Sequence, residues 1–191
     1  MKKYLLIFGV IGLFAYNSFF KGNLHSNPSF ANLERGSYSR AIQIVGGINH
    51  ILESPRKLSN HDVEILTIGA EGGSGSAQWA LGYYYLANAN GDKATLNSAF
   101  NWLKASAKSA YPLGVQTMAL VLNGADPYSK GKLKNRGFDY VYAKAATECY
   151  DYKPDYILVK RVKEIERTRS AKELSKFKLQ AEKAKSMLCF G

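Results

Sequence analysis

The chain is 191 residues long, 46% of its residues are hydrophobic, and its formal net charge at pH 7 is +11. This length predicts one domain with a core of its own, and the hydrophobic fraction excludes a chain that stays disordered. A basic protein attracts anionic surfaces, so the charge favours partners such as lipid headgroups, cell-wall polymers or acidic proteins.

The first 21 residues carry the pattern of an export signal. Lys2 and Lys3 precede an uncharged, largely apolar stretch, residues 4–20, which is followed by Lys21. A basic start before an apolar stretch is typical of a secretory signal, and about 17 residues is also the shortest helix that spans a membrane. We expect a cleaved signal peptide or a retained membrane anchor, with a buried helix of a cytosolic protein as the third alternative, and then a linker over 22–36. Because an exported protein meets lipid, wall polymers and proteins first, we expect no nucleic-acid partner.

A repeated pattern of small and apolar residues follows this linker. Segment 77–85 reads Ala-x-x-x-Leu-Gly-x-x-Tyr, a related pattern begins 37 residues later at Gly114, and a fainter one begins 36 residues earlier at Ala41. Self-similarity at such a period is typical of stacked helical hairpins. The apolar spacing predicts three helix pairs, which we place at 37–52 and 59–70, 74–89 and 95–108, and 111–123 and 136–149.

The repeated residues are expected to pack helices together rather than to perform chemistry. Ala and Gly allow two helix backbones to cross closely, and the larger Leu and Tyr fill the space on either side of the crossing. We assign this structural role to Gly73, Ala77, Leu81, Gly82 and Tyr85.

These residues resemble the first half of the Sel1-like repeat, a relative of the tetratricopeptide repeat, and Ala99, Trp102 and Ala107 match its second half. The resemblance covers roughly residues 37–150. It implies an all-α fold, an α-solenoid of about three helical hairpins, which we expect a long C-terminal helix to cap. The family is known mainly for scaffolding and partner recognition, often in bacterial envelopes. The resemblance therefore implies a non-enzymatic adaptor, periplasmic or anchored in the inner membrane facing the periplasm, with a periplasmic immunity protein that neutralises a secreted toxin as an alternative.

A protein partner is expected on the concave face, which the first helix of each hairpin lines in such a solenoid. Trp79 and Tyr83 lie one turn apart on this helix, and the equivalent positions of the neighbouring hairpins hold Gln43, Gln116 and Leu120. We predict that these five residues bind the partner, because aromatic side chains supply much of the binding energy of interfaces. The alternative is that Trp79 fills the core between hairpins.

A basic segment, 151–191, ends the chain. Residues 155–188 contain neither Gly nor Pro, and apolar residues at spacings of 3 and 4 predict one long helix with a slip at 167–169. This helix either covers the open end of the solenoid or binds an anionic polymer or lipid through its lysines. If straight, it would hold Cys149 and Cys189 about 50 Å apart, so an intramolecular disulfide is expected only if the helix breaks near 168–171. Otherwise Cys189 could pair between chains.

No catalytic or metal-binding motif is recognisable in the sequence. The histidines His25, His50 and His61 form no metal-ligand spacing with a cysteine or a carboxylate pair. The glycine-rich stretch 69–75 lacks the Lys-Ser/Thr pair of a phosphate-binding loop. We therefore predict no enzymatic activity, no cofactor and no metal, and keep a hydrolase or cell-wall enzyme as the alternative class.

Overall fold

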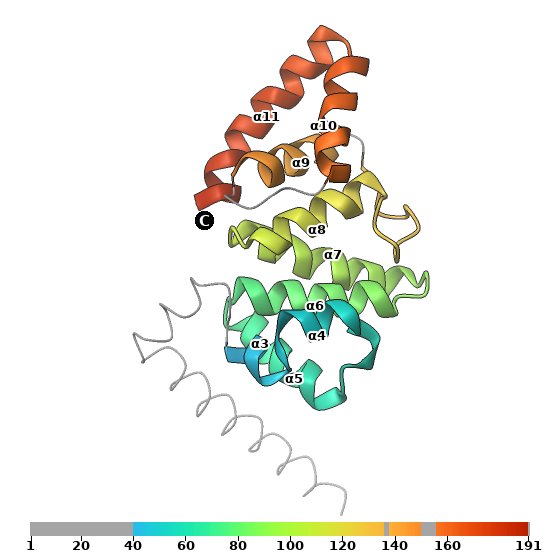
Figure 1. Ribbon diagram of the computed structural model, residues 1–191, viewed down its shortest axis with the longest axis vertical. Coiled ribbons are helices and arrows are strands. Elements are labelled where there is room, and N and C mark those ends of the chain that lie inside the picture. The colour runs from blue at the N-terminus through green and yellow to red at the C-terminus, as the bar shows by residue number, and fades with distance from the viewer. Residues whose placement is uncertain (1–39, 136–137, 150–155, 191) are drawn as a thin grey trace, which may run out of the picture.

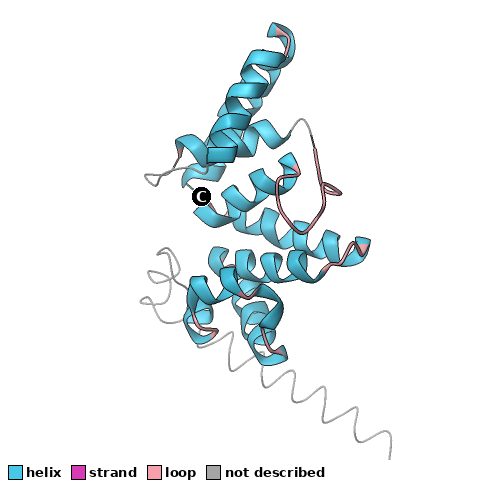
Figure 2. Cartoon of the chain, turned by 45° about the vertical axis from the view of Figure 1, so that its right-hand side comes forward, coloured by secondary structure: helices cyan, strands magenta, loops and turns pink. Residues whose placement is uncertain are grey.

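A computed structural model describes residues 40–135, 138–149 and 156–190, and in these ranges the chain is helical with no strand (Figures 1 and 2). The all-α class predicted from the sequence is confirmed. The expected signal or anchor, the linker and His25 lie outside the described residues. Among the helices that the structure describes, none combines the length and the apolar character needed to cross a membrane.

The helices follow one another through short connections. The N-terminal part comprises α3 (Arg40–Ile44), α4 (Gly47–Glu53), the 3₁₀ helix η1 (Pro55–Lys57) and α5 (Asn60–Glu71). The central part comprises α6 (Gly75–Asn88), α7 (Lys93–Lys108), α8 (Pro112–Asn123) and α9 (Phe138–Glu148). The C-terminal part comprises α10 (Tyr156–Thr168) and α11 (Ala171–Phe190).

Each helix from α5 to α9 packs against the next one along the chain. Figure 1 shows these helices stacked in chain order, from α5 in teal to α9 in orange. At the end of the stack α9 contacts both α10 and α11. The apolar faces of consecutive helices thereby join into one buried cluster that runs from Ile42 to Leu188.

Polar side chains mark where several of these helices begin. The side-chain oxygens of Ser59, Ser74 and Asp92 accept hydrogen bonds from backbone N–H groups three residues later, at 3.2, 3.3 and 2.7 Å. Such bonds satisfy donors that have no partner inside the first turn of a helix. At Ser59 the Asp62 carboxylate also accepts a bond from the Ser59 hydroxyl and another from its N–H, and these bonds lower the pKa of the Asp62 carboxyl.

The expected first helix, 37–52, is instead two short helices, α3 and α4. Gly46 lies between them and Gly47 begins α4, with φ angles of 92° and 87°. This left-handed region suits glycine and is unfavourable for residues with a Cβ atom, and it is incompatible with a continuous right-handed helix. The prediction of one uninterrupted helix was wrong because two consecutive glycines end it.

The expected single C-terminal helix is also two helices, which meet at Arg169 and Ser170. The Ser170 hydroxyl accepts a hydrogen bond from the N–H of Glu173 at 3.3 Å, and the Glu173 carboxylate accepts one from the N–H of Ser170 at 3.3 Å. This reciprocal pair is a capping box, which starts a new helix. The chain turns back at this point, so α10 and α11 form a hairpin (Figure 1).

The reversal brings the two cysteines together. Cys149 and Cys189 form a disulfide within the chain, and their Cα atoms are 5.1 Å apart. The expectation of a straight helix, with Cys189 free to pair between chains, was therefore wrong. The break near 168–171, under which an internal bridge was expected, is present.

Small residues determine how closely α6 approaches α7. A Cβ atom on Gly82 would lie 2.8 Å from Leu103 Cγ and 2.9 Å from the backbone nitrogen of Leu103. Ala77 and Leu81 of the same helix are buried, and Tyr85 is half-buried. Gly73 lies in the turn before α6 with φ 92°, where glycine is favoured. Only a residue without a side chain fits at position 82 at this separation of the two backbones.

Candidate interaction surface

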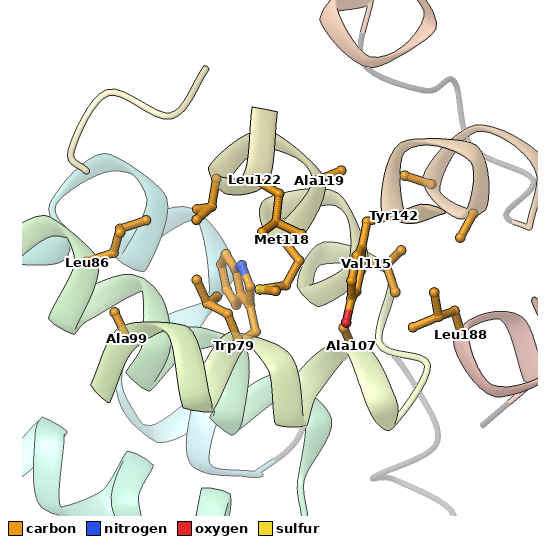
Figure 3. Packing of buried hydrophobic residues seen from close by; sticks show 14 of the residues in the cluster. Trp79, Leu86, Ala99, Ala107, Val115, Met118, Ala119, Leu122, Tyr142 and Leu188 are labelled. Carbon is orange, nitrogen blue, oxygen red and sulfur yellow. The ribbon is translucent and has the colours of Figure 1, made fainter. Parts of the chain in front are cut away.

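Trp79 lies inside the molecule with 0% of its surface exposed. Its indole Nε1–H donates a hydrogen bond of 3.1 Å to Thr117 Oγ1 on α8. Figure 3 shows it among buried side chains of α7 and α8, including Ala99 and Met118. The prediction that Trp79 contacts a partner is corrected, since a side chain without exposed surface cannot do so. Trp79 instead occupies the core between hairpins, which was the stated alternative.

Tyr83 lies next to the buried Trp79 and is itself partly exposed to solvent. Its ring stacks on Trp79, with ring centroids 5.7 Å apart and the planes inclined by 19°. The side chain is half-buried, and burial together with a hydrogen bond to Tyr128 raises the pKa of its hydroxyl. The half-buried Tyr111 also lies near Trp79, with ring centroids 6.2 Å apart.

Tyr128 and Arg56 extend the arrangement, and neither was predicted from the sequence. The Tyr128 ring meets Tyr83 edge-on with centroids 5.7 Å apart, and the Arg56 guanidinium lies 5.7 Å from the Tyr128 centroid. Arg56 is fixed from the other side, because its Nε donates a hydrogen bond of 2.8 Å to the backbone oxygen of Ala87. We call Tyr111, Trp79, Tyr83 and Tyr128 the aromatic row.

A buried carboxylate holds Tyr128 in place. Asp126 Oδ1 accepts hydrogen bonds from the N–H groups of Tyr128 and Ser129 at 3.0 and 2.6 Å, and Asp126 Oδ2 accepts one from the Ser129 hydroxyl. An Asp that bonds the backbone two and three residues later is a common device of turns. The segment Asp126-Pro127-Tyr128-Ser129 was therefore a signal for an ordered turn, although its sequence does not indicate which helix the tyrosine touches.

The remaining predicted contact residues lie on helices beside the aromatic row. Gln116 and Leu120 are half-exposed on α8, which contacts α6, and Gln43 is exposed on α3, which also contacts α6. In the part of the chain that the structure describes, no hydrogen bond occupies the side chain of either glutamine. Tyr83 thus lies on α6 between Trp79 and Tyr128, and Gln116 and Leu120 lie on the neighbouring helix α8.

A buried carboxylate and an arginine form a structural ion pair away from the aromatic row. The carboxylate of Asp139, with 0% exposure, accepts bonds from Arg161 Nη2 and Nε at 2.7 and 3.1 Å, and this pair joins α9 to α10. His50 and His61 are exposed, and the described ranges hold no group of three or more residues able to bind a metal ion.

Comparison of the chain with protein-family models, with curated proteins and with solved structures gives no match.

Proposed function

We propose that the protein is a non-enzymatic interaction module, a short α-solenoid of Sel1-like hairpins that binds a protein partner in the bacterial cell envelope. The binding surface consists of Tyr83, Tyr128, Gln116 and Leu120, with Gln43 at its N-terminal side. The observation that carries the proposal is the aromatic row: the half-exposed Tyr83 stacks on a fully buried, hydrogen-bonded tryptophan, and the half-exposed Tyr128 packs edge-on against Tyr83.

The aromatic row has the properties of an energetic hot spot. Binding energy at interfaces concentrates in Tyr, Trp and Arg side chains that are already held in position, because little conformational entropy is lost when they bind. Tyr83 is held by Trp79, and Tyr128 is held by Asp126 and Arg56. The surface is thus ordered before a partner arrives.

The cell-envelope part of the proposal is supported by the disulfide and by the N-terminal sequence. Disulfides persist in oxidising compartments such as the bacterial periplasm and are rare in the cytosol. The Cys149–Cys189 bridge and the basic-then-apolar start of the chain favour the same location.

Site-specific photocrosslinking in cells tests the proposal. A photoreactive amino acid replaces Gln116 on the proposed surface or, as the matched control, the exposed Asn101 on α7. We expect one protein to crosslink from position 116 but not from 101, and to be lost when Tyr128→Ala and Arg56→Ala are added. Identical crosslinked proteins from both positions, or a crosslink that both substitutions leave unchanged, would exclude this surface. Trp79 is unsuitable for the test because its removal disturbs the core.

A further inference from the structure

In the hairpin of α10 and α11, basic residues lie on the sides of the two helices opposite their buried apolar residues. Both helices pack on α9 through apolar residues such as Leu158 and Ile165 of α10 and Ala181 and Leu188 of α11. Their opposite faces therefore point outward. Figures 1 and 2 show the turn of this hairpin at the end of the described chain opposite α3.

Exposed lysines and an arginine occupy these outward faces. The residues concerned are Lys160, Lys163 and Arg167 on α10, and Lys172, Lys176 and Lys183 on α11. Their spacings of 3, 4 and 7 residues place each set along one side of its helix. We call these six residues the basic face.

Most acidic residues of the hairpin bind other groups and do not neutralise the charge of the basic face. Glu164 pairs with Arg161 at 3.2 Å, Glu166 accepts bonds from Tyr140 and Lys144 at 3.0 and 3.4 Å, and Glu173 caps α11. The fourth, Glu182, is exposed beside the basic face. Within the described ranges no ion pair joins an acidic residue to any of the six basic ones.

Apolar side chains are exposed among these charges. Leu179 is 57% exposed and lies between Lys176 and Lys183 on the outer side of α11, and Met187 is 43% exposed one turn beyond Lys183. At the start of α10, Tyr156 is 76% exposed. A surface that combines spaced lysines with isolated apolar residues matches the headgroup region of an anionic bilayer, where lysines meet phosphates and apolar side chains enter the acyl boundary.

We propose that the basic face of the α10–α11 hairpin docks on an anionic lipid bilayer. A protein interface is disfavoured because lysine is depleted at the centres of such interfaces. A soluble polyanion offers nothing for Leu179 and Met187 to enter. The 20 residues of α11 extend over about 30 Å, a length suited to lying along a flat surface. This docking does not use Tyr83 on α6 or Tyr128 in the loop after α8, so both remain available for a protein partner.

The test is vesicle flotation of the full-length oxidised chain. Vesicles of phosphatidylcholine are compared with vesicles that also contain phosphatidylglycerol. Any insertion of the apolar N-terminal segment contributes to both, so the difference between them measures the effect of the anionic lipid. The triple variant Lys172→Gln, Lys176→Gln, Lys183→Gln is compared with Lys57→Gln, Lys93→Gln, Lys104→Gln, which removes the same charge from exposed positions elsewhere. Glutamine preserves helix propensity in both variants.

We expect phosphatidylglycerol to increase the partitioning of the wild type and of the control variant onto vesicles. In the hairpin variant this increase should be at least about tenfold smaller. High salt should reduce the enhancement. Equal losses in the two triple variants would overturn the proposal, because net charge alone would then explain binding.

A second variant separates lipid from other polyanions. Leu179→Gln should weaken binding to phosphatidylglycerol vesicles and leave binding to soluble polyphosphate unchanged. If Leu179→Gln has no effect on the vesicles, and polyphosphate competes fully for the chain, the surface recognises charge alone and the bilayer is not its ligand. Neither result affects crosslinking from position 116.

Discussion

The indole Nε1–H of Trp79 and the hydroxyl of Thr117 are joined by a hydrogen bond of 3.1 Å across 38 residues of sequence. Both partners belong to first helices of neighbouring hairpins, α6 and α8. The bond satisfies the polar atom of a side chain that has no exposed surface. It therefore fixes the ring against which Tyr83 stacks.

Thr117→Val should destabilise the protein through this bond. The substitution keeps the volume of the side chain but leaves a buried N–H without its partner, which costs about 1–3 kcal/mol. Trp79→Phe removes the N–H itself, so the double variant should lose less stability than the two single variants together. Urea unfolding of the four proteins measures this coupling, and additivity within about 0.5 kcal/mol would show that the bond does not contribute.

Gly82→Ala tests the close approach of α6 and α7. Helix propensity alone favours alanine by about 1 kcal/mol. The added Cβ would, however, lie 2.9 Å from the backbone nitrogen of Leu103, an atom that cannot move without its helix. We expect a net loss of about 1–3 kcal/mol in the free energy of unfolding. A stabilised variant in thermal denaturation would show that the two helices can separate freely.

Arg161→Met tests the pair that joins α9 to α10. Loss of the Arg161 guanidinium leaves the Asp139 carboxylate, which has 0% exposure, without its cation. Breaking such a buried pair costs about 3–5 kcal/mol in the free energy of unfolding. Replacing Asp139 by Asn in the same chain should restore part of this loss, because no buried charge remains. A cost below about 1 kcal/mol in chemical denaturation, the range of exposed pairs, would contradict the assignment.

Tyr140 should make the protein sensitive to alkaline pH. Burial, together with the 3.0 Å hydrogen bond to Glu166, raises the pKa of its hydroxyl from 10.0 to about 12. A raised pKa in the folded state contributes stability that is complete below pH 10 and is lost as the pH rises toward 12.

Tyr140→Phe should therefore cost about 1 kcal/mol at neutral pH and make the decline above pH 10 shallower. Tyr156→Phe, at a residue that is 76% exposed, is the matched control and should follow the wild type. Thermal denaturation across this pH range distinguishes them, and identical alkaline slopes for all three proteins would refute the role of Tyr140.

The helices could be predicted because their apolar spacing repeats. For example, the expected 95–108 corresponds to Lys93–Lys108, and 111–123 to Pro112–Asn123. The two misplaced elements have local causes that were present in the sequence. Gly46-Gly47 ends a helix, and Ser170-x-x-Glu173 starts one, but each was read as part of a longer periodic stretch. The disulfide requires the second of these breaks, because only the reversal at Ser170 brings the two cysteines together. A prediction of one continuous helix therefore also places the cysteines apart.

The candidate site was less predictable than the helices. Periodicity placed Trp79 on the first helix of its hairpin but could not distinguish the core from the surface, because its depth depends on the position of Thr117 in the next hairpin. Tyr128 and Arg56 lie between the predicted helices, where the repeat has no matching positions. The contact of Tyr128 with Tyr83, and that of Arg56 with Tyr128, depend on how the loop after α8 and η1 return toward α6, which no local pattern encodes.

The bridge between Cys149 and Cys189 closes a covalent ring that contains α10 and α11. A protease that cuts once inside this ring, for example after Arg169 at the turn of the hairpin, opens the ring without releasing a fragment. The two pieces migrate together on a non-reducing gel and separate only after reduction. Because of this ring, α11 stays attached beside α9 after a cut that would release it from a chain without the bridge.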